Sequence, residues 1–179
     1  YLGTRGETGG EPFTKLNISG VTPPVLTVEG TFDGYTVNDI FVEGDYAFLA
    51  TTNNSKEVLI LDVSSVPYTE VGYYDASGST DAYSVFIDGD VGYVAQGRYI
   101  RSFDTSSYVG ARSSIGSERT GWWFANISQI YGVDDYLFLV LNNDWYELTI
   151  MDISNPADMT VTSQTSVNNQ QVLDMYVND

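Results

Sequence analysis

The sequence contains no cysteine and no histidine. It therefore has no disulfides, no Ser-His-Asp or Cys-His catalytic groups, no histidine metal sites and no cysteine-ligated zinc or iron–sulfur centres. Basic residues are also scarce, since 7 Lys and Arg stand against 24 Asp and Glu, which gives a formal net charge of −17. Nucleic acids and anionic membranes bind basic faces, so neither is expected as a partner, whereas cations and basic surfaces are favoured.

Long apolar runs and helical patterns are missing as well. No apolar run approaches the ~18 residues of a membrane span, so none is expected in this chain. The chain begins at Tyr1 without a signal-peptide pattern, from which we expect a processed product. Hydrophobic residues nevertheless make up 42% of the 179 residues, enough for one globular domain with its own core.

The sequence does contain a repeated pattern of short β-strands. The clearest example begins at Val37 with an apolar strand, followed by a tight turn at residues 43–45 and a second strand over residues 46–50. A polar turn then leads to a third strand over residues 57–63. Glycine at the centre of the first turn suits a hairpin, because glycine tolerates positive φ.

The pattern recurs at constant spacing. Segments beginning at Ala82 and Ile127 align with it without a gap, 45 and 90 residues after Val37, and a partial copy begins at Val172, 135 residues after it. Repeats of this length that carry several strands are typical of β-propellers. We therefore predict an all-β fold, a single β-propeller domain over residues 1–179 with about four blades, each a four-stranded antiparallel sheet.

The predicted repeats cover approximately residues 37–81, 82–126 and 127–171, with a split repeat formed by residues 172–179 and 1–36. In the split repeat, a first strand from the end of the chain would join later strands from its beginning. Closed propellers commonly join their ends in this way, because closure removes exposed sheet edges. Closure would place Asp179 beside Tyr1; the alternative is a fragment of a larger propeller.

Three segments resemble the LVIVD repeat: Val-Glu-Gly-Asp-Tyr-Ala-Phe-Leu-Ala at residues 42–50, Leu-Ile-Leu-Asp-Val-Ser at 59–64 and Ile-Met-Asp-Ile-Ser-Asn-Pro at 150–156. The resemblance extends over nearly the whole chain and is weakest after Phe103, where the Asn-Pro step is missing. It implies a β-propeller of a bacterial or archaeal protein that is secreted or displayed at the cell surface, sometimes with an anchor or a pilin-like leader. It implies no catalytic motif.

Four polar residues share one position of the first strand at 45-residue intervals: Asp39, Ser84, Gln129 and Asp174. The first strand of each propeller blade lines the central axis, so these side chains could converge near one mouth of the channel. There they would hold water, a cation or a small ligand. The alternative, which we favour, is that they form structural hydrogen bonds at the interfaces between blades.

Acidic residues fall in the hairpin turns, at Glu43, Asp45, Asp88, Asp90, Asp134 and Asp135. Their oxygens could bind calcium, but no complete calcium-binding loop is present, and tight turns favour Gly and Asp in any case. We expect no cofactor, with calcium at these turns as the alternative. Asp62, Asp104 and Asp152 follow third strands, where capped turns are expected rather than a ring of carboxylates.

Trp145 lies in a polar Asn-Asn-Asp turn and is the best candidate for an exposed aromatic contact. We expect no enzymatic activity. The leading hypothesis is a secreted or surface-displayed β-propeller that acts as an interaction or structural module of a cell-surface assembly. Its partner would be a protein or a glycan, and self-assembly is a further expectation. The alternatives are a glycan-binding adhesin and, less favoured, a glycosidase, which needs two carboxylates about 5–10 Å apart in a pocket.

Overall fold

The computed structural model consists of strands and turns, and it describes residues 1–3, 12–121, 126–142, 145–167, 172 and 175–177. No helix occurs among these residues, so none of them forms a helix that could cross a membrane. The strands form four main sheets, which we call the first to fourth blades.

The first blade contains β1 (Leu2–Gly3), β2 (Phe13–Ile18) and β3 (Leu26–Phe32). The second contains β4 (Val37–Glu43), β5 (Tyr46–Thr51), β6 (Val58–Asp62) and β7 (Thr69–Tyr74). The third contains β8 (Ala82–Asp88), β9 (Val91–Gln96), β10 (Tyr99–Asp104) and β12 (Ser114–Arg119). The fourth contains β13 (Ile127–Val133), β14 (Tyr136–Leu141), β15 (Leu148–Asp152) and β16 (Thr160–Thr165).

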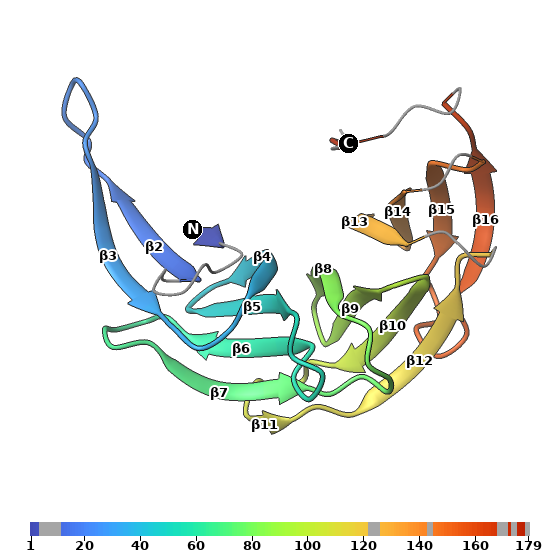
Figure 1. Ribbon diagram of the computed structural model, residues 1–179, viewed down its shortest axis with the longest axis horizontal. Coiled ribbons are helices and arrows are strands. Elements are labelled where there is room, and N and C mark those ends of the chain that lie inside the picture. Colours follow the sequence, from blue (N-terminus) through green and yellow to red (C-terminus); the bar gives the residue numbers. More distant parts are fainter. Residues whose placement is uncertain (4–11, 122–125, 143–144, 168–171, 173–174, 178–179) are drawn as a thin grey trace.

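The blades lie side by side in an open arc, with β4, β8 and β13 on its inner side and β7, β12 and β16 on its outer side (Figure 1). This arrangement confirms the predicted β-propeller architecture of antiparallel blades. Within the described part of the chain, β1 pairs with β2 alone, and Val172 and residues 175–177 belong to no strand. These residues therefore do not close the ring, and Asp179 lies outside the described residues.

Each complete blade carries the same irregularity at the same place. Pairing between the first two strands skips Asn38, Tyr83 and Ser128, each directly before a predicted axial residue. Such β-bulges bend a strand and turn the next side chain to a new direction. The hairpin turns also match, with positive φ at Gly44 (56°), Gly89 (54°) and Asp134 (48°). The 45-residue repeat therefore extends to backbone conformation.

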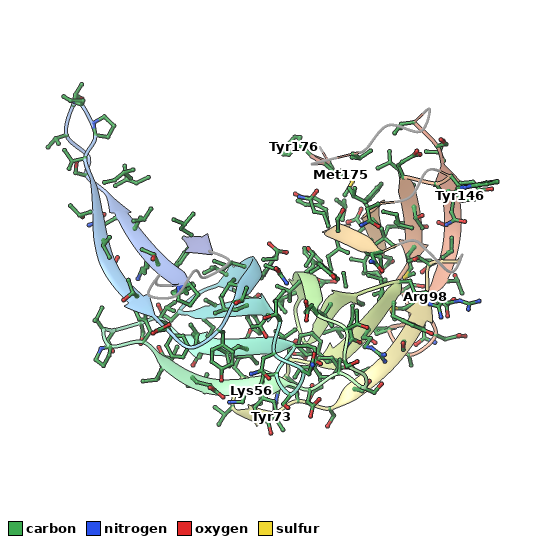
Figure 2. All side chains as sticks on the ribbon, viewed as in Figure 1. Lys56, Tyr73, Arg98, Tyr146, Met175 and Tyr176 are labelled. Carbon is green, nitrogen blue, oxygen red and sulfur yellow. The ribbon has the colours of Figure 1, made fainter. Side chains whose placement is uncertain are left out.

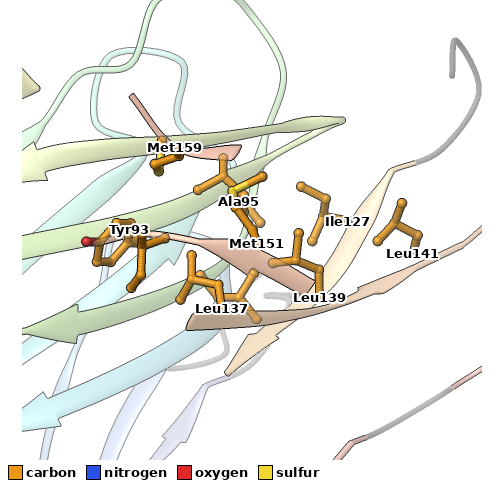
Figure 3. Packing of buried hydrophobic residues seen from close by; sticks show 11 residues of the cluster. Tyr93, Ala95, Ile127, Leu137, Leu139, Leu141, Met151 and Met159 are labelled. Atoms are coloured by element: carbon orange, nitrogen blue, oxygen red, sulfur yellow. The ribbon is translucent and has the colours of Figure 1, made fainter. Parts of the chain in front are cut away.

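The hydrophobic core lies mainly between the blades. Between the third and fourth blades, Tyr93 and Ala95 pack against Leu137, Leu139 and Met151 (Figure 3). Similar clusters join the second blade to the third and the first blade to the second. Alternate residues of a strand face opposite sides of its sheet, so each inner blade has one apolar face for each neighbour.

The third repeat crosses over to the second blade. Its two-residue strand β11 (Gly110–Ala111) pairs in parallel with β7. Just before β11, the ring of Tyr108 packs edge-on against Tyr46 and Phe48, at centroid distances of 4.6 and 5.2 Å. This crossing explains the irregular sequence after Phe103, because the segment follows the surface of the preceding blade before it forms β12.

Gly72 of β7 lies directly beneath this crossing segment. A Cβ at Gly72 would overlap the carbonyl oxygen of Tyr108 and lie 2.8 Å from that of Gly110. We expect Gly72→Ala to lower the free energy of unfolding by about 1–3 kcal/mol, measured by urea denaturation. Gly20→Ala is the control, because a Cβ there meets nothing within 4 Å. Equal losses in the two variants would show that the crossing is not packed as described.

Candidate functional site

Two of the four predicted axial residues are in direct contact. Ser84 Oγ donates a hydrogen bond to Asp39 Oδ2 at 2.6 Å, and the N–H of Val85 donates to the same oxygen at 3.0 Å. The other carboxylate oxygen, Oδ1, accepts from the N–H of Ile40 at 2.9 Å. Both oxygens of Asp39 are therefore engaged by the protein's own donors.

The contact continues to the fourth blade. The N–H of Ile130 donates to Ser84 Oγ at 3.2 Å, and Ser84 is only 1% exposed. Val85 and Ile130 are equivalent by the 45-residue repeat, so Asp39 and Ser84 each bind the same backbone position of the next inner strand. Gln129 occupies the equivalent place on β13, and Asp174 lies outside the described residues. This geometry connects neighbouring blades, and the oxygens of Asp39 and Ser84 are occupied in doing so.

Asp39→Ala should destabilise the protein, because it leaves the buried donors of Ser84 and Val85 without their acceptor. A buried donor that loses its partner costs about 1–3 kcal/mol, and we expect a loss of this size in urea denaturation. Asp45→Ala removes the same charge from an exposed turn of the same blade and should change little. A loss for Asp45→Ala as large as that for Asp39→Ala would contradict the connecting role.

A shallow hollow lies where the hairpin turns of the third and fourth blades meet. Its volume is about 780 Å³, and its lining consists of Phe86, Asp88, Tyr131, Gly132, Val133, Asp134 and Asp135. The rings of Phe86 and Tyr131 lie 6.5 Å apart. A Cβ at Gly132 would overlap the ring of Phe86, so this ring reaches its position because glycine stands opposite it.

Aromatic residues at this level of the arc form a row. Phe41 packs edge-on against Phe86 at 5.4 Å, and Phe86 is followed by Tyr131. These three residues are again 45 positions apart, and Tyr176 is the next in the series. This row was not predicted from the sequence, although the aligned repeats place an aromatic residue at each of these equivalent positions. Below the hollow, burial raises the pKa of Tyr93 to about 12, and Asp88 and Asp135 add to the shift.

Five of the basic residues form contacts outside the hollow: Lys15, Lys56, Arg98, Arg101 and Arg112. Lys56 Nζ lies 2.6 Å from Glu70 Oε1 and 5.4 Å from the ring centre of Tyr73, next to which Figure 2 shows it. The hydrogen bond to Glu70 is the main cause of the raised pKa of Lys56. None of the three ion pairs found among the described residues involves a carboxylate of the hollow. The negative charge of the hollow is thus not neutralised by an ion pair within that part of the chain.

Residues 34–75 and 130–166 match the family model of the LVIVD repeat. In these two segments the chain is similar to the LVIVD repeat. The matched segments coincide with the second and fourth blades, and no curated protein is significantly similar to the chain in sequence.

Two solved structures have a fold similar to that of this chain. A protein from Lactobacillus plantarum has a TM-score of 0.69 at 15% identity, over 86% of this chain and 51% of its own. The computationally designed Ika8 protein has a TM-score of 0.60 at 8% identity, over 84% of this chain and 44% of its own. At these identities the similarity shows the fold alone. This chain spans about half the length of each of these two solved chains.

The Asp-x-Ser step of the LVIVD repeat forms capped turns, as predicted. In the second blade, Ser64 donates to Asp62 Oδ1 through its hydroxyl at 2.6 Å and its N–H at 2.9 Å. Asp152 accepts in the same way from Ser154, and Asp104 accepts from the N–H of Ser106. These bonds hold the pKa of Asp62, Asp104 and Asp152 below the usual value. Among the described residues, no group of three or more acidic side chains is arranged to bind a metal ion.

The hollow lies at the beginning of β14, and Trp145 follows the other end of this strand. Its side chain is 76% exposed, and that of Tyr146 is 37% exposed. The turn before β15 presents both residues on the outer part of the fourth LVIVD blade, where Figure 2 shows Tyr146. This aromatic surface and the hollow are separate, because they lie at opposite ends of one strand.

Two buried glutamates were not recognised from the sequence. Glu57 and Glu147 are equivalent residues of the two matched LVIVD repeats, and both are fully buried. Glu57 Oε2 accepts from the N–H of Ala76 at 2.8 Å, and Glu147 Oε2 accepts from that of Val167 at 2.9 Å. Each carboxyl therefore binds the segment that follows the outer strand of its own blade. Burial raises the pKa of Glu57.

The raised pKa of Glu57 predicts a pH effect on stability. The folded protein holds this proton more tightly than the unfolded chain, so the contribution of Glu57 to stability falls as the pH rises above its ordinary value of 4.5. Glu57→Gln keeps an oxygen for the N–H of Ala76 and removes the ionisation. We expect its free energy of unfolding to rise relative to the natural protein between pH 4 and pH 7. A difference between variant and natural protein that stays constant over this pH range would contradict the assignment.

Proposed function

We propose that this LVIVD-repeat β-propeller is a non-catalytic module that binds a protein partner as part of an extracellular or cell-surface assembly. The hollow between the third and fourth blades would receive a basic segment of that partner. The observation that carries the proposal is the combination, in one concave site, of two aromatic rings with the carboxylates of Asp88, Asp134 and Asp135.

The chemistry of the hollow suits a lysine or arginine side chain. A cation near the face of an aromatic ring is stabilised by about 0.5–2 kcal/mol, depending on how far it is desolvated. Phe86 and Tyr131 supply such rings, and three carboxylates lie beside them. The net charge of −17 would also draw basic partners to the protein over longer distances.

The non-catalytic part of the proposal is supported by the structural hydrogen bonds that the repeated polar residues form. Asp39 and Ser84, at the axial positions, are engaged in bonds between blades. The Asp-x-Ser steps are engaged in turns. Placement outside the cell rests on the resemblance to LVIVD-repeat proteins that are secreted or surface-displayed.

Binding of a fluorescein-labelled lysine- and arginine-rich peptide, followed by anisotropy at low ionic strength, tests the hollow. We expect the double variant Asp88→Asn, Asp135→Asn to weaken binding by about threefold or more, because exposed charge pairs contribute about 0.2–1 kcal/mol each. The control is Asp45→Asn, Asp158→Asn, which makes the same change in net charge at exposed positions elsewhere. Equal weakening in both double variants would mean that the hollow is not the binding site.

The second candidate function is glycan binding by the aromatic surface around Trp145. It is favoured by the 76% exposure of this side chain, since sugars stack on exposed aromatic rings. The two functions separate in one comparison of variants. Glycan binding lost on Trp145→Ala and retained in Asp88→Asn, Asp135→Asn would favour the adhesin over the peptide-binding module.

A further inference from the structure

The two ends of the arc carry the faces that elsewhere meet between neighbouring blades. We call the side of a blade that packs on the following blade its front face and the other side its back face. The front face of the second blade and the back face of the third bury a shared cluster, and so do the third and fourth blades. The first blade has no preceding blade among the described residues, and the fourth has no following one there.

The back face of the first blade is apolar and exposed. Pairing of β2 with β3 sets Leu16 opposite Val28 and Ile18 opposite Leu26, and Leu2 lies on the same side. The equivalent residues of the fourth blade pack on the third. They are Leu137, Met151, Ile153, Met159 and Val161.

The exposed fractions show the difference between these two back faces. Leu2 is 49% exposed where Leu137 is 0% exposed. Ile18 is 65% exposed where Ile153 is 4% exposed, and Leu26 is 63% exposed where Met159 is 3% exposed. The first blade therefore has the residues of a blade interface without the blade that would cover them.

The front face of the fourth blade, at the other end of the arc, also lacks a covering blade among the described residues. Its residues Tyr136, Phe138, Val140, Leu148 and Ile150 correspond to Tyr46, Phe48, Ala50, Val58 and Ile60 of the second blade. Phe48, Val58 and Ile60 are fully buried against the third blade. Val140 is buried as well, but Phe138, Leu148 and Ile150 are only partly buried, and Tyr136 is 42% exposed. Neither end face, so defined, contains a charged residue.

We propose that a second copy of this chain covers both faces, with the front face of each fourth blade packed on the back face of the other copy's first blade. The contact would continue the series of interfaces already present within the arc. It is a head-to-tail contact, which forms a closed ring when the rotation between copies completes a circle. Two arcs joined at both ends would also leave no end face exposed.

Apolar burial would drive the association, since fully burying a Leu or Ile side chain contributes about 1.5–3 kcal/mol. The charge of −17 on each copy opposes it, so the association should strengthen as salt screens the repulsion.

Sedimentation velocity of the 179-residue chain at 0.15 and 0.5 M NaCl provides the test. We expect twice the chain mass, with a tighter dimer at the higher salt concentration. Ile18→Lys should weaken association at least tenfold. Adding a positive charge to an acidic protein reduces repulsion, so this loss would come from the apolar contact. The control is Val109→Lys, because Val109 is equally exposed at 66% but lies on neither end face. A monomer at all concentrations, or equal effects of the two variants, would overturn the proposal.

Complementation between variants tests the head-to-tail geometry. Ile18→Lys damages the back face and Tyr136→Lys the front face, so each variant alone should be monomeric. A mixture of the two retains one intact front face and one intact back face, and dimers should reappear. The head-to-tail contact requires this recovery, so failure of the mixture to dimerise would exclude it.

The dimer does not depend on what the hollow binds. The Ile18→Lys variant has an unchanged hollow and should bind the basic peptide as before if the proposed function is correct. Loss of peptide binding with an intact dimer would count against the proposed function alone. Peptide binding by a chain that is always monomeric would count against the dimer alone.

Discussion

Each blade of this protein has two apolar faces and can cover neither of them by itself. The structure depends on this constraint, because a flat sheet of three or four strands encloses no core and only a second sheet can exclude water from its faces. The buried clusters accordingly lie between blades, with Tyr93 and Ala95 of one blade against Leu137 and Met151 of the next. Stability in such an array is a sum over neighbouring pairs, and the ends are its weakest points. The exposed side chains of Ile18 and Leu26 show where that sum is incomplete.

Polar contacts on the inner side of the arc fix the relative positions of the blades that the apolar faces hold together. A hydrophobic interface is not directional and would tolerate sliding, whereas Ser84 can bond both Asp39 and the backbone at Ile130 in only one register. A β-bulge precedes Asp39 and Ser84, and the fourth blade has the equivalent bulge before Gln129. The inner strands therefore determine spacing and the faces supply most of the burial energy.

Much of the fold could be predicted from the sequence, because the same pattern of strands and turns occurs in three aligned copies. Strands β4, β8 and β13 begin at Val37, Ala82 and Ile127, the residues from which the repeat was counted. The capped turns at Asp62 and Asp152 were likewise predictable from local chemistry. The crossing of β11 onto β7 was not, because it depends on how one blade's loop meets another blade's surface. The packing of Phe86 against Tyr131 also arises only when blades are brought together, although the repeat spacing already placed these aromatic residues at equivalent positions.

The same reasoning bears on where a ligand would bind. A residue that holds two blades in register cannot readily be released to a ligand, because its donors would be left buried without a partner. Asp39 and Ser84 are in that position. The carboxylates that line the hollow form none of the ion pairs found in the described part of the chain, and the turn backbone is set by Gly89 and Asp134 with positive φ. Substitution of the lining carboxylates should therefore disturb the fold less than substitution of Asp39 or Ser84, which makes this rim the more suitable place for the binding site proposed above.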